Sequence, residues 1–321
     1  MNTEIRPLVT IGIPTYNRAD GYLKEALECA LAQTYPNIEI VVADNGSTDN
    51  TGAVVQSYGD PRIRYFRHNP PIKPNDNFNF CLSQASGIYF QLLHDDDLID
   101  CDFIECCMQA AEYRTDVGII RTGARIIDAH GKILNELRND SGGLSTAEFF
   151  LAWLDSRTWM FLSSVLFNTA RLREIGGFNS KHQLFQDVLA EFEVAARFGR
   201  VDVPDVKASF RKHGSQRTGA ALPRLWCEDS VYLLQAMCRL AAEQQGLIRR
   251  KGREHFAKHN YELASSIRSP VDRYGVYLLI YRTFDHAYSP LRYFGARAHR
   301  RLFTWLGRVK RFMRGKMRVV S

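Results

Sequence analysis

Four short apolar runs, separated by helix-like segments, constrain the fold of this chain more than any other feature of its sequence. The runs lie at residues 8–13, 38–43, 63–67 and 88–93. Helical patterns lie between and after them, at about residues 21–33, 50–58, 75–85 and 101–113. Strands that alternate with helices form parallel sheets, and strands covered by helices on both faces are almost continuously apolar. We therefore predict an α/β fold, a mostly parallel sheet flanked by helices.

The rest of the chain contains a less regular stretch followed by a helical region. Residues 117–137 are predicted to form two strands that turn at residues 129–131, and Ser145 with Glu148 forms a capping box at the start of a helix. A strand at residues 165–168, a helix at 183–198 and a strand at 201–210 are predicted next. After residue 220 apolar residues recur at spacings of three and four, which is typical of helices. We predict one domain at residues 1–220 and a helical C-terminal region at 221–321.

The positive charge of the chain is concentrated at its C-terminal end. The net charge is +7, yet residues 292–321 contain ten Lys or Arg and no acid, so residues 1–291 have a net charge of −3. Apolar residues such as Trp305 and Phe312 recur between these cations, which is the pattern of an interfacial amphipathic helix. We predict that this basic tail binds an anionic membrane surface. Packing of its apolar stripe on the rest of the protein is the alternative.

Apolar segments and cysteines bear on the compartment of the protein. No apolar run is long enough for a signal peptide or a membrane span; the richest, residues 274–281, is far too short. The seven cysteines form no Cys-x-x-Cys pair, which favours reduced thiols. With the basic tail, these features predict a cytoplasmic protein that is peripheral on the inner face of the cell membrane.

Polar and acidic residues follow each of the four predicted strands. The segments are residues 14–18, 44–49, 68–70 and 94–97. The carboxyl ends of parallel strands meet at one edge of a sheet, where ligands bind. The three consecutive acids Asp95, Asp96 and Asp97 repel one another, so a hard divalent cation is expected to offset their charge. A solvated loop or a helix N-cap is the alternative. Glycine-rich dinucleotide and P-loop motifs are absent from the sequence.

The order of these motifs resembles that of the family 2 glycosyltransferases, which have the Rossmann-like GT-A fold. The motifs are IGIPTYNR, VVADNGSTD, HDDD, and GGFN before an acidic helix, and they extend over residues 8 to about 215. The resemblance implies an enzyme that transfers a sugar from a nucleotide-sugar donor with inversion of the anomeric carbon. It also implies a divalent metal cofactor, Mn2+ or Mg2+, and assigns residues 1–220 as the catalytic domain.

The resemblance places the donor nucleotide at the ends of the first two strands. The implied nucleotide-sugar-binding residues there are Pro14, Thr15, Tyr16, Asn17, Arg18, Asp44 and Asn45. Asp44 falls where the family accepts a hydrogen bond from a pyrimidine. A carboxylate can accept from the N3–H of uracil or thymine, whereas cytosine has no such donor, so a UDP- or dTDP-sugar is expected. An Asx-turn is the alternative role for Asp44.

The resemblance also assigns the residues around the donor diphosphate. His94 occupies the first position of the usual Asp-x-Asp-Asp motif, so Asp95 falls near the ribose and Asp96 on the metal. Asp97 is a second metal candidate. His94 is expected to be a buried histidine beside the metal ligands, and ligation of a softer ion such as manganese is its alternative role. Arg211 and His213 lie in a stretch that closes over the diphosphate in the family, which implies phosphate binding by Arg211 and metal or phosphate binding by His213. A solvated basic loop is the alternative for this stretch.

Inversion requires a general base that takes the proton of the acceptor hydroxyl. In the family this base is an acid on the helix after the Gly-Gly-Phe turn, which corresponds to Asp187 here. Glu191 lies one helical turn further on the same face and is the second candidate. The alternative role for Asp187 is structural, because an acid in the first turn stabilises a helix through the helix dipole.

These features predict a non-processive enzyme that adds one sugar to a hydroxyl of a growing surface glycan. Because the basic tail is expected to bind a membrane, a lipid-linked glycan is one candidate acceptor. Single transfer is expected because the Gln-x-x-Arg-Trp motif and membrane helices of polymer synthases are absent from the sequence. A sugar-phosphate nucleotidyltransferase is disfavoured because its Gly-x-Gly-Thr-Arg loop is missing. A protein that binds nucleic acid or another anionic polymer through the tail is disfavoured because residues 1–291 are net negative. No nucleic-acid partner is expected.

Overall fold

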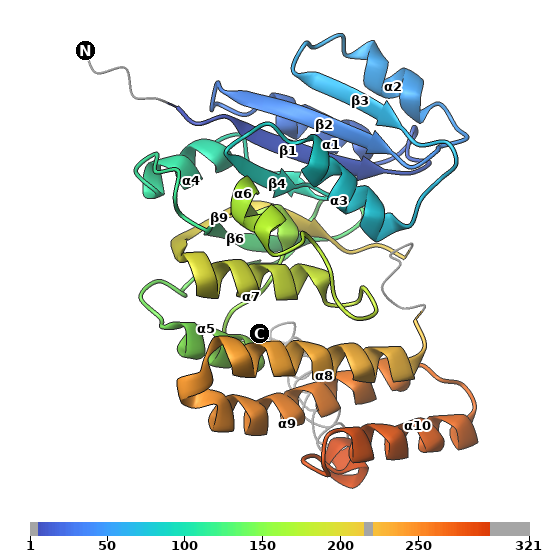
Figure 1. Cartoon of the computed structure of the whole chain (residues 1–321). Helices are drawn as coiled ribbons and strands as arrows, with labels where there is room; N and C mark the ends of the chain where they lie inside the picture. Colours follow the sequence, from blue (N-terminus) through green and yellow to red (C-terminus); the bar gives the residue numbers. More distant parts are fainter. Residues whose placement is uncertain (1–5, 215–220, 296–321) are drawn as a thin grey trace, which may run out of the picture.

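The computed structural model describes residues 6–214 and 221–295 (Figure 1). Most of the predicted basic tail therefore lies outside the described residues. The first half of the sheet is parallel, as predicted, with β1 (Val9–Thr15), β2 (Ile38–Asp44), β3 (Ile63–Arg67) and β4 (Tyr89–Leu92) in the spatial order β3-β2-β1-β4. The predicted helices are α1 (Leu23–Leu31), α2 (Thr51–Ser57), α3 (Pro74–Gln84) and α4 (Phe103–Ala110). The carboxyl ends of β1 and β2 consequently lie side by side.

The second half of the sheet is mixed. Strand β8 (Val165–Asn168) pairs antiparallel with β4, and β6 (Ile119–Ile127) pairs antiparallel with β8. Strand β9 (Arg200–Arg211) runs parallel to β6 and pairs on its other side with the two-residue β5 (Leu98–Ile99). The predicted hairpin joins β6 to β7 (Ile133–Leu137), and Gly131 at its turn has a φ of 79°. These pairings bring the end of β9 against the loop that follows β4.

Three helices and one short 3-10 turn occupy the middle of the chain. Helix α5 (Thr146–Leu154) has the predicted capping box, in which Ser145 and Glu148 bond each other's backbone N–H groups. The turn η1 (Leu162–Ser164) precedes β8, and α6 (Thr169–Glu174) begins at Asn168, whose side chain accepts from Arg171 N. Helix α7 (Gln186–Phe198) begins three residues later than predicted and ends at Gly199, as predicted.

The C-terminal region is helical, as predicted, and packs against α7 and α5 (Figure 1). Its elements are α8 (Pro223–Leu240), η3 (Ala242–Gln244), α9 (Gln245–Ala264) and α10 (Pro270–Thr283). Trp153 of α5 lies between Phe192 of α7 and Phe256 of α9, with ring centroids 5.4 and 5.9 Å away. One hydrophobic core therefore continues from the sheet into these helices. None of the helices in residues 6–214 and 221–295 is both long and apolar enough to cross a membrane.

Candidate active site

The loop after β1 is bonded to both neighbouring strand ends. Thr15 Oγ1 donates to Asp95 Oδ2 at 2.7 Å, and Arg18 Nε lies 3.7 Å from Asp95 Oδ1. Burial raises the pKa of Asp95, and the charge of adjacent Asp96 raises it further. Asn17, at a φ of 52°, accepts from Thr48 N at 2.8 Å. The residues predicted to bind the nucleotide are thus brought together at one edge of the sheet.

The carboxylate of Asp44 is buried beneath this loop. Its Oδ1 accepts from Ser47 N at 2.8 Å, and its Oδ2 accepts from the Tyr65 hydroxyl at 2.6 Å. The Asp44 side chain thus closes a turn onto the backbone three residues on, one residue further than in the Asx-turn proposed as its alternative role. Each carboxylate oxygen has a second lone pair, so a further hydrogen bond from a nucleobase is compatible with this turn.

Asn45 holds the loop that follows β3. Its Nδ2 donates to Ile72 O at 2.9 Å, and its Oδ1 accepts from Ile72 N at 2.8 Å. The side chain of Asn45, predicted to bind the nucleotide sugar, is thus committed to holding this loop. Its contact with a donor remains a prediction.

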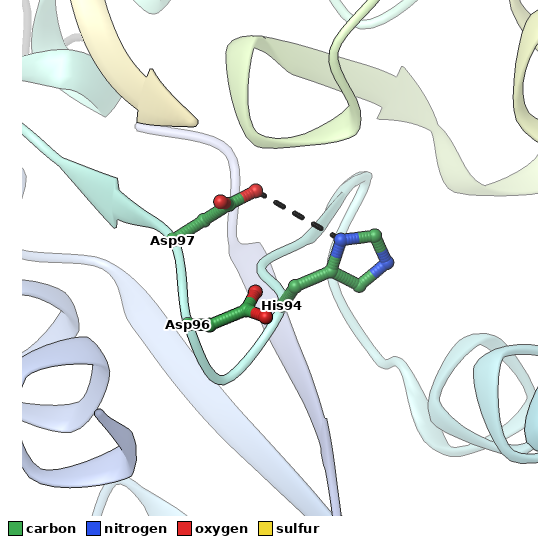
Figure 2. A group of neighbouring side chains, drawn as sticks. All are labelled: His94, Asp96 and Asp97. Carbon is green, nitrogen blue, oxygen red and sulfur yellow. Dashed lines mark ion pairs between the residues drawn. The ribbon is translucent and has the colours of Figure 1, made fainter. Parts of the chain in front are cut away.

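A cluster of potential metal ligands follows β4 (Figure 2). His94, Asp96 and Asp97 each present one donor atom, and these atoms lie within 4.8 Å of one another. His94 Nδ1 is 3.8 Å from Asp97 Oδ2, and the buried His94 Nε2 has no hydrogen-bond partner among the described residues. Two carboxylates and an imidazole suit Mn2+ better than Mg2+, which prefers oxygen ligands. The residues present therefore fit a divalent transition metal.

Asp97 and His213 connect this cluster to β9. Asp97 Oδ1 accepts from Arg211 N at 2.9 Å, and burial raises the pKa of Asp97 to about 7. His213 Nε2 lies 2.8 Å from Asp96 Oδ2, which places this predicted metal or phosphate ligand beside the acid cluster. The pairing of β9 with β5 explains this approach, because β5 directly follows the acids along the chain.

The guanidinium of Arg211 is buried within protein contacts. Its Nε donates to Asp96 O at 2.9 Å, its Nη2 lies 2.7 Å from Glu25 Oε2, and its Cζ lies 4.3 Å from the centroid of the Tyr22 ring. Arg211 thus fixes the backbone of the acid loop. Its predicted phosphate contact remains a prediction. Glu25 and Tyr22 were not predicted from the sequence; they lie on or beside α1, nearly 190 residues before Arg211.

The turn that precedes α7 depends on two glycines with positive φ. Gly176 and Gly177 have φ values of 88° and 75°, and a Cβ on Gly177 would collide with Asn79 Oδ1. That oxygen accepts from Phe178 N at 2.8 Å, and Asn79 Nδ2 donates to Phe178 O at 3.0 Å. Helix α3 therefore fixes the position of the chain before the candidate base.

Asp187 lies in the first turn of α7 and is half-buried. Its Oδ1 accepts from Val188 N at 2.8 Å. Burial raises the pKa of Asp187, whereas the nearby His94 acts in the opposite direction. The candidate base is thus near His94, a member of the candidate metal cluster. A raised pKa makes Asp187 a stronger base than an ordinary aspartate.

Glu191 points into the protein interior. It has no exposed surface, its Oε2 lies 3.3 Å from Arg121 Nε, and its Oε1 has no hydrogen-bond partner among the described residues. Burial raises the pKa of Glu191 to about 7, although Arg121 opposes this shift. Arg121 also binds Asp202 at 3.2 Å. This environment favours Asp187 over Glu191 as the base.

Asp229 of α8 holds the loop between the glycine turn and Asp187, and the sequence analysis missed it. Its buried carboxylate accepts from Ser180 Oγ at 2.7 Å and from the backbone N–H groups of His182, Leu184 and Phe185, each at 2.9 Å. No sequence signal marks this role, because the partners are separated along the chain and an acid within a helix is ordinary. The C-terminal region thereby positions the start of α7.

We expect Asp229→Asn to lower kcat by roughly a hundredfold while leaving donor KM nearly unchanged. The amide keeps one acceptor oxygen but turns an NH2 group toward backbone donors, so the loop before Asp187 should shift. Steady-state kinetics and a thermal melt check this. Glu174→Gln, at an exposed ion pair, serves as the control. A lower Tm with unchanged kcat would limit Asp229 to a structural role.

Slightly less than half of the chain matches a known family model. Residues 10–157 match the family model described as "Glycosyl transferase family 2". This segment is a family 2 glycosyltransferase domain. Asp187, Arg211 and His213 lie beyond the matched residues, so their proposed roles depend on the structure and on the resemblance noted above.

Curated relatives share only part of this chain. An uncharacterized glycosyltransferase of Rickettsia bellii is 40% identical over 138 residues, which is 42% of this chain and 20% of that protein. Chondroitin synthase of Escherichia coli is 34% identical over 134 residues, 40% of this chain and 19% of that protein. The chain thus aligns with about a fifth of the length of these two relatives.

Solved structures confirm the GT-A fold. S. aureus TarS in complex with UDP superposes with a TM-score of 0.65 at 15% identity, covering 89% of this chain and 82% of that chain. The mannosyltransferase PcManGT from Pyrobaculum calidifontis, in complex with GDP-Man and Mn2+, gives a TM-score of 0.53 at 19% identity, covering 88% and 83%. At these identities the likeness establishes the fold alone.

Proposed function

We propose that this family 2 protein is an inverting, metal-dependent glycosyltransferase that transfers one sugar from a UDP- or dTDP-sugar to a hydroxyl of a growing surface glycan. One observation carries the proposal: the possible metal ligands His94, Asp96 and Asp97 gather directly after β4 of a GT-A fold, beside the residues predicted to bind the nucleotide. The UDP and GDP-Man complexes of the structural neighbours support a nucleotide-sugar donor.

The preference for uridine or thymidine depends on Asp44. Its carboxylate is fixed by Ser47 and Tyr65, which orient it without using all of its lone pairs. An N3–H donor can complete this arrangement, whereas the N3 atom of cytosine would face it as a second acceptor. Asp95, held by Thr15 and Arg18, is assigned to the ribose.

His94, Asp96 and Asp97 are the residues that would hold a divalent metal. When bound, the metal would offset the negative charge of the donor diphosphate. The chain itself provides the rest of the site. Arg211 holds the backbone of the acid loop through Asp96 O, and β9 donates its N–H to Asp97. These bonds hold the loop that carries Asp96 and Asp97 in place before any donor binds.

Asp187 is assigned as the general base. Its carboxylate takes the proton of the acceptor hydroxyl while the acceptor oxygen forms a bond to the anomeric carbon. The bond between that carbon and the diphosphate oxygen breaks, and its electron pair leaves with the diphosphate. Attack from the face opposite to the leaving group inverts the anomeric centre.

The raised pKa of Asp187 predicts a loss of activity on the acid side of the pH profile. The base works only when it is ionised, so kcat should be constant at high pH and fall as the pH drops through the pKa of Asp187. Because burial raises this pKa, the fall should occur at a higher pH than for a solvent-exposed aspartate. A profile of kcat that stays flat down to the usual aspartate range would contradict this assignment.

A panel of nucleoside diphosphates tests the donor assignment. UDP and dTDP in the presence of Mn2+ should raise the Tm, because a ligand that binds only the folded state stabilises it. CDP should have little effect under the same conditions. A larger stabilisation by CDP than by UDP would overturn the role of Asp44.

We also propose that residues 221–321 form a helical region whose basic tail holds the enzyme on an anionic membrane near a glycan or lipid-linked glycan acceptor. Tyr293, the second residue of the tail, supports a boundary at this point between the packed helices and the basic tail. It is buried, its hydroxyl donates to Glu262 Oε2 at 2.6 Å, and its ring lies 5.2 Å from that of Tyr261. The helical core is therefore anchored at this residue.

Truncation after Tyr293 should leave a cooperatively folded enzyme that no longer sediments with anionic vesicles. The removed segment carries nine of the ten tail cations. Transfer to a soluble acceptor should persist, because an anchor is dispensable for an acceptor in solution. Aggregation or loss of the cooperative melt would show instead that the apolar stripe of the tail packs on the protein.

A further inference from the structure

We propose that a cationic groove along α8 binds a negatively charged acceptor glycan, an inference that rests on the proposed function. The groove begins with a cavity of about 640 Å3 between α8, α9 and the end of α10. Three guanidinium groups line this cavity, those of Arg239, Arg249 and Arg253, together with one acid, Asp285. The lining therefore carries a net positive charge.

Within residues 6–214 and 221–295, other side chains neutralise only part of this positive charge. Arg253 forms an ion pair with Asp285, and Arg249 donates only to the neutral Gln245 side chain, at 3.1 Å. Arg239 is exposed and forms no ion pair with another residue in the described part of the chain. Residues 1–291 have a net charge of −3, so this concentration of cations is not a general property of the surface.

A second hollow lies next to the cavity, beside the loop that precedes Asp187. It has a volume of about 470 Å3 and shares Val231 and Gln235 with the first cavity, so the two adjoin along one face of α8. Ser180, Lys181 and Glu228 line its other side, and Lys181 pairs with Glu228 at 2.8 Å, so the unpaired cations of the groove lie at its arginine-lined end. Ser180 and Lys181 belong to the loop that Asp229 holds and that leads directly into Asp187. The groove therefore runs from the loop of the candidate base to the arginine-lined cavity.

The size and the charge of the groove indicate the class of ligand. Pockets of roughly 300 to 1,000 Å3 enclose small organic ligands, so the two hollows together have room for several linked sugars. Guanidinium groups bind carboxylates and phosphates through paired, charge-assisted hydrogen bonds. The groove thus fits a glycan that carries acidic groups a few sugars away from the accepting hydroxyl.

Calorimetry with a hyaluronan tetrasaccharide, which carries carboxylates, and neutral chitotetraose tests this inference. The test variant is Arg239→Gln/Arg249→Gln. The control is Arg250→Gln/Arg268→Gln, which removes two exposed cations that do not line the cavity. We expect the wild type to prefer the acidic tetrasaccharide, the test variant to bind it roughly tenfold or more weakly, and the control to match the wild type.

Titration of UDP with Mn2+ in the same three proteins separates this inference from the proposed function. Failure of the wild type to bind UDP would overturn the proposed function. Two results would overturn the groove inference alone if UDP binding is normal. One is equal affinity of the wild type for the two tetrasaccharides, and the other is an unchanged affinity of the test variant for the acidic tetrasaccharide. If the test variant instead loses binding only to phosphatidylglycerol vesicles, the cavity binds lipid headgroups and the glycan assignment is wrong.

Discussion

Asp187→Asn is expected to lower the rate of sugar transfer by about 100 to 10,000-fold while leaving UDP binding nearly intact. The amide cannot take the proton of the acceptor hydroxyl, but it is close to the carboxylate in shape. Because the base acts on the acceptor in the transition state, its loss should appear in kcat rather than in donor affinity. Measurement of UDP release and of UDP affinity in the same preparations checks both parts.

Glu191→Gln is the matched comparison for this prediction. Glu191 lies one helical turn from Asp187. Because its pKa is raised to about 7, a large fraction of Glu191 is protonated near neutral pH, and the uncharged glutamine resembles this protonated form. We expect near-normal turnover from this variant. Near-normal turnover in Asp187→Asn together with a large loss in Glu191→Gln would assign the base to Glu191 instead.

Arg121→Ala is expected to destabilise the protein by about 3 to 5 kcal/mol, because it leaves the buried carboxyl group of Glu191 without its partner. The Arg121 guanidinium lies 3.3 Å from Glu191 and 3.2 Å from Asp202, and its Cζ lies 4.7 Å from the centroid of the Phe149 ring. Urea unfolding at neutral pH measures the loss.

The double variant Arg121→Met/Glu191→Leu serves as the control for Arg121→Ala. It replaces the pair with apolar side chains, and Asp202 keeps Arg200 as its partner at 2.7 Å. Much of the lost stability should therefore return. Equal destabilisation of the double variant and of Arg121→Ala would show that lost packing, rather than an uncompensated charge, explains the effect.

The sequence predicted the parallel half of the sheet well because its signal is local. The run at residues 63–67 became β3 without change, and the capping box of Ser145 and Glu148 formed as expected. The pairing of β9 with both β6 and β5 was not predictable. It depends on register between segments far apart in the chain, and the two residues of β5 are too few to show a pattern.

The candidate site was predictable only in part, for a related reason. Motif residues that follow adjacent parallel strands must converge, so the proximity of Thr15 and Asp95 follows from topology. Glu191 shares a helical face with Asp187, yet packing places its carboxylate beside buried Arg121, which helical spacing cannot reveal. The role of Asp229 depends on how α8 packs against the loop before α7.

Calorimetric titration of UDP into the protein tests the central claim most directly, namely that the strand edge forms a metal-dependent nucleoside-diphosphate site. We predict clear binding with Mn2+, and a large loss of affinity both with a chelator and in an Asp96→Asn/Asp97→Asn variant that still melts cooperatively. Equal UDP affinity with Mn2+ and with the chelator would contradict the account.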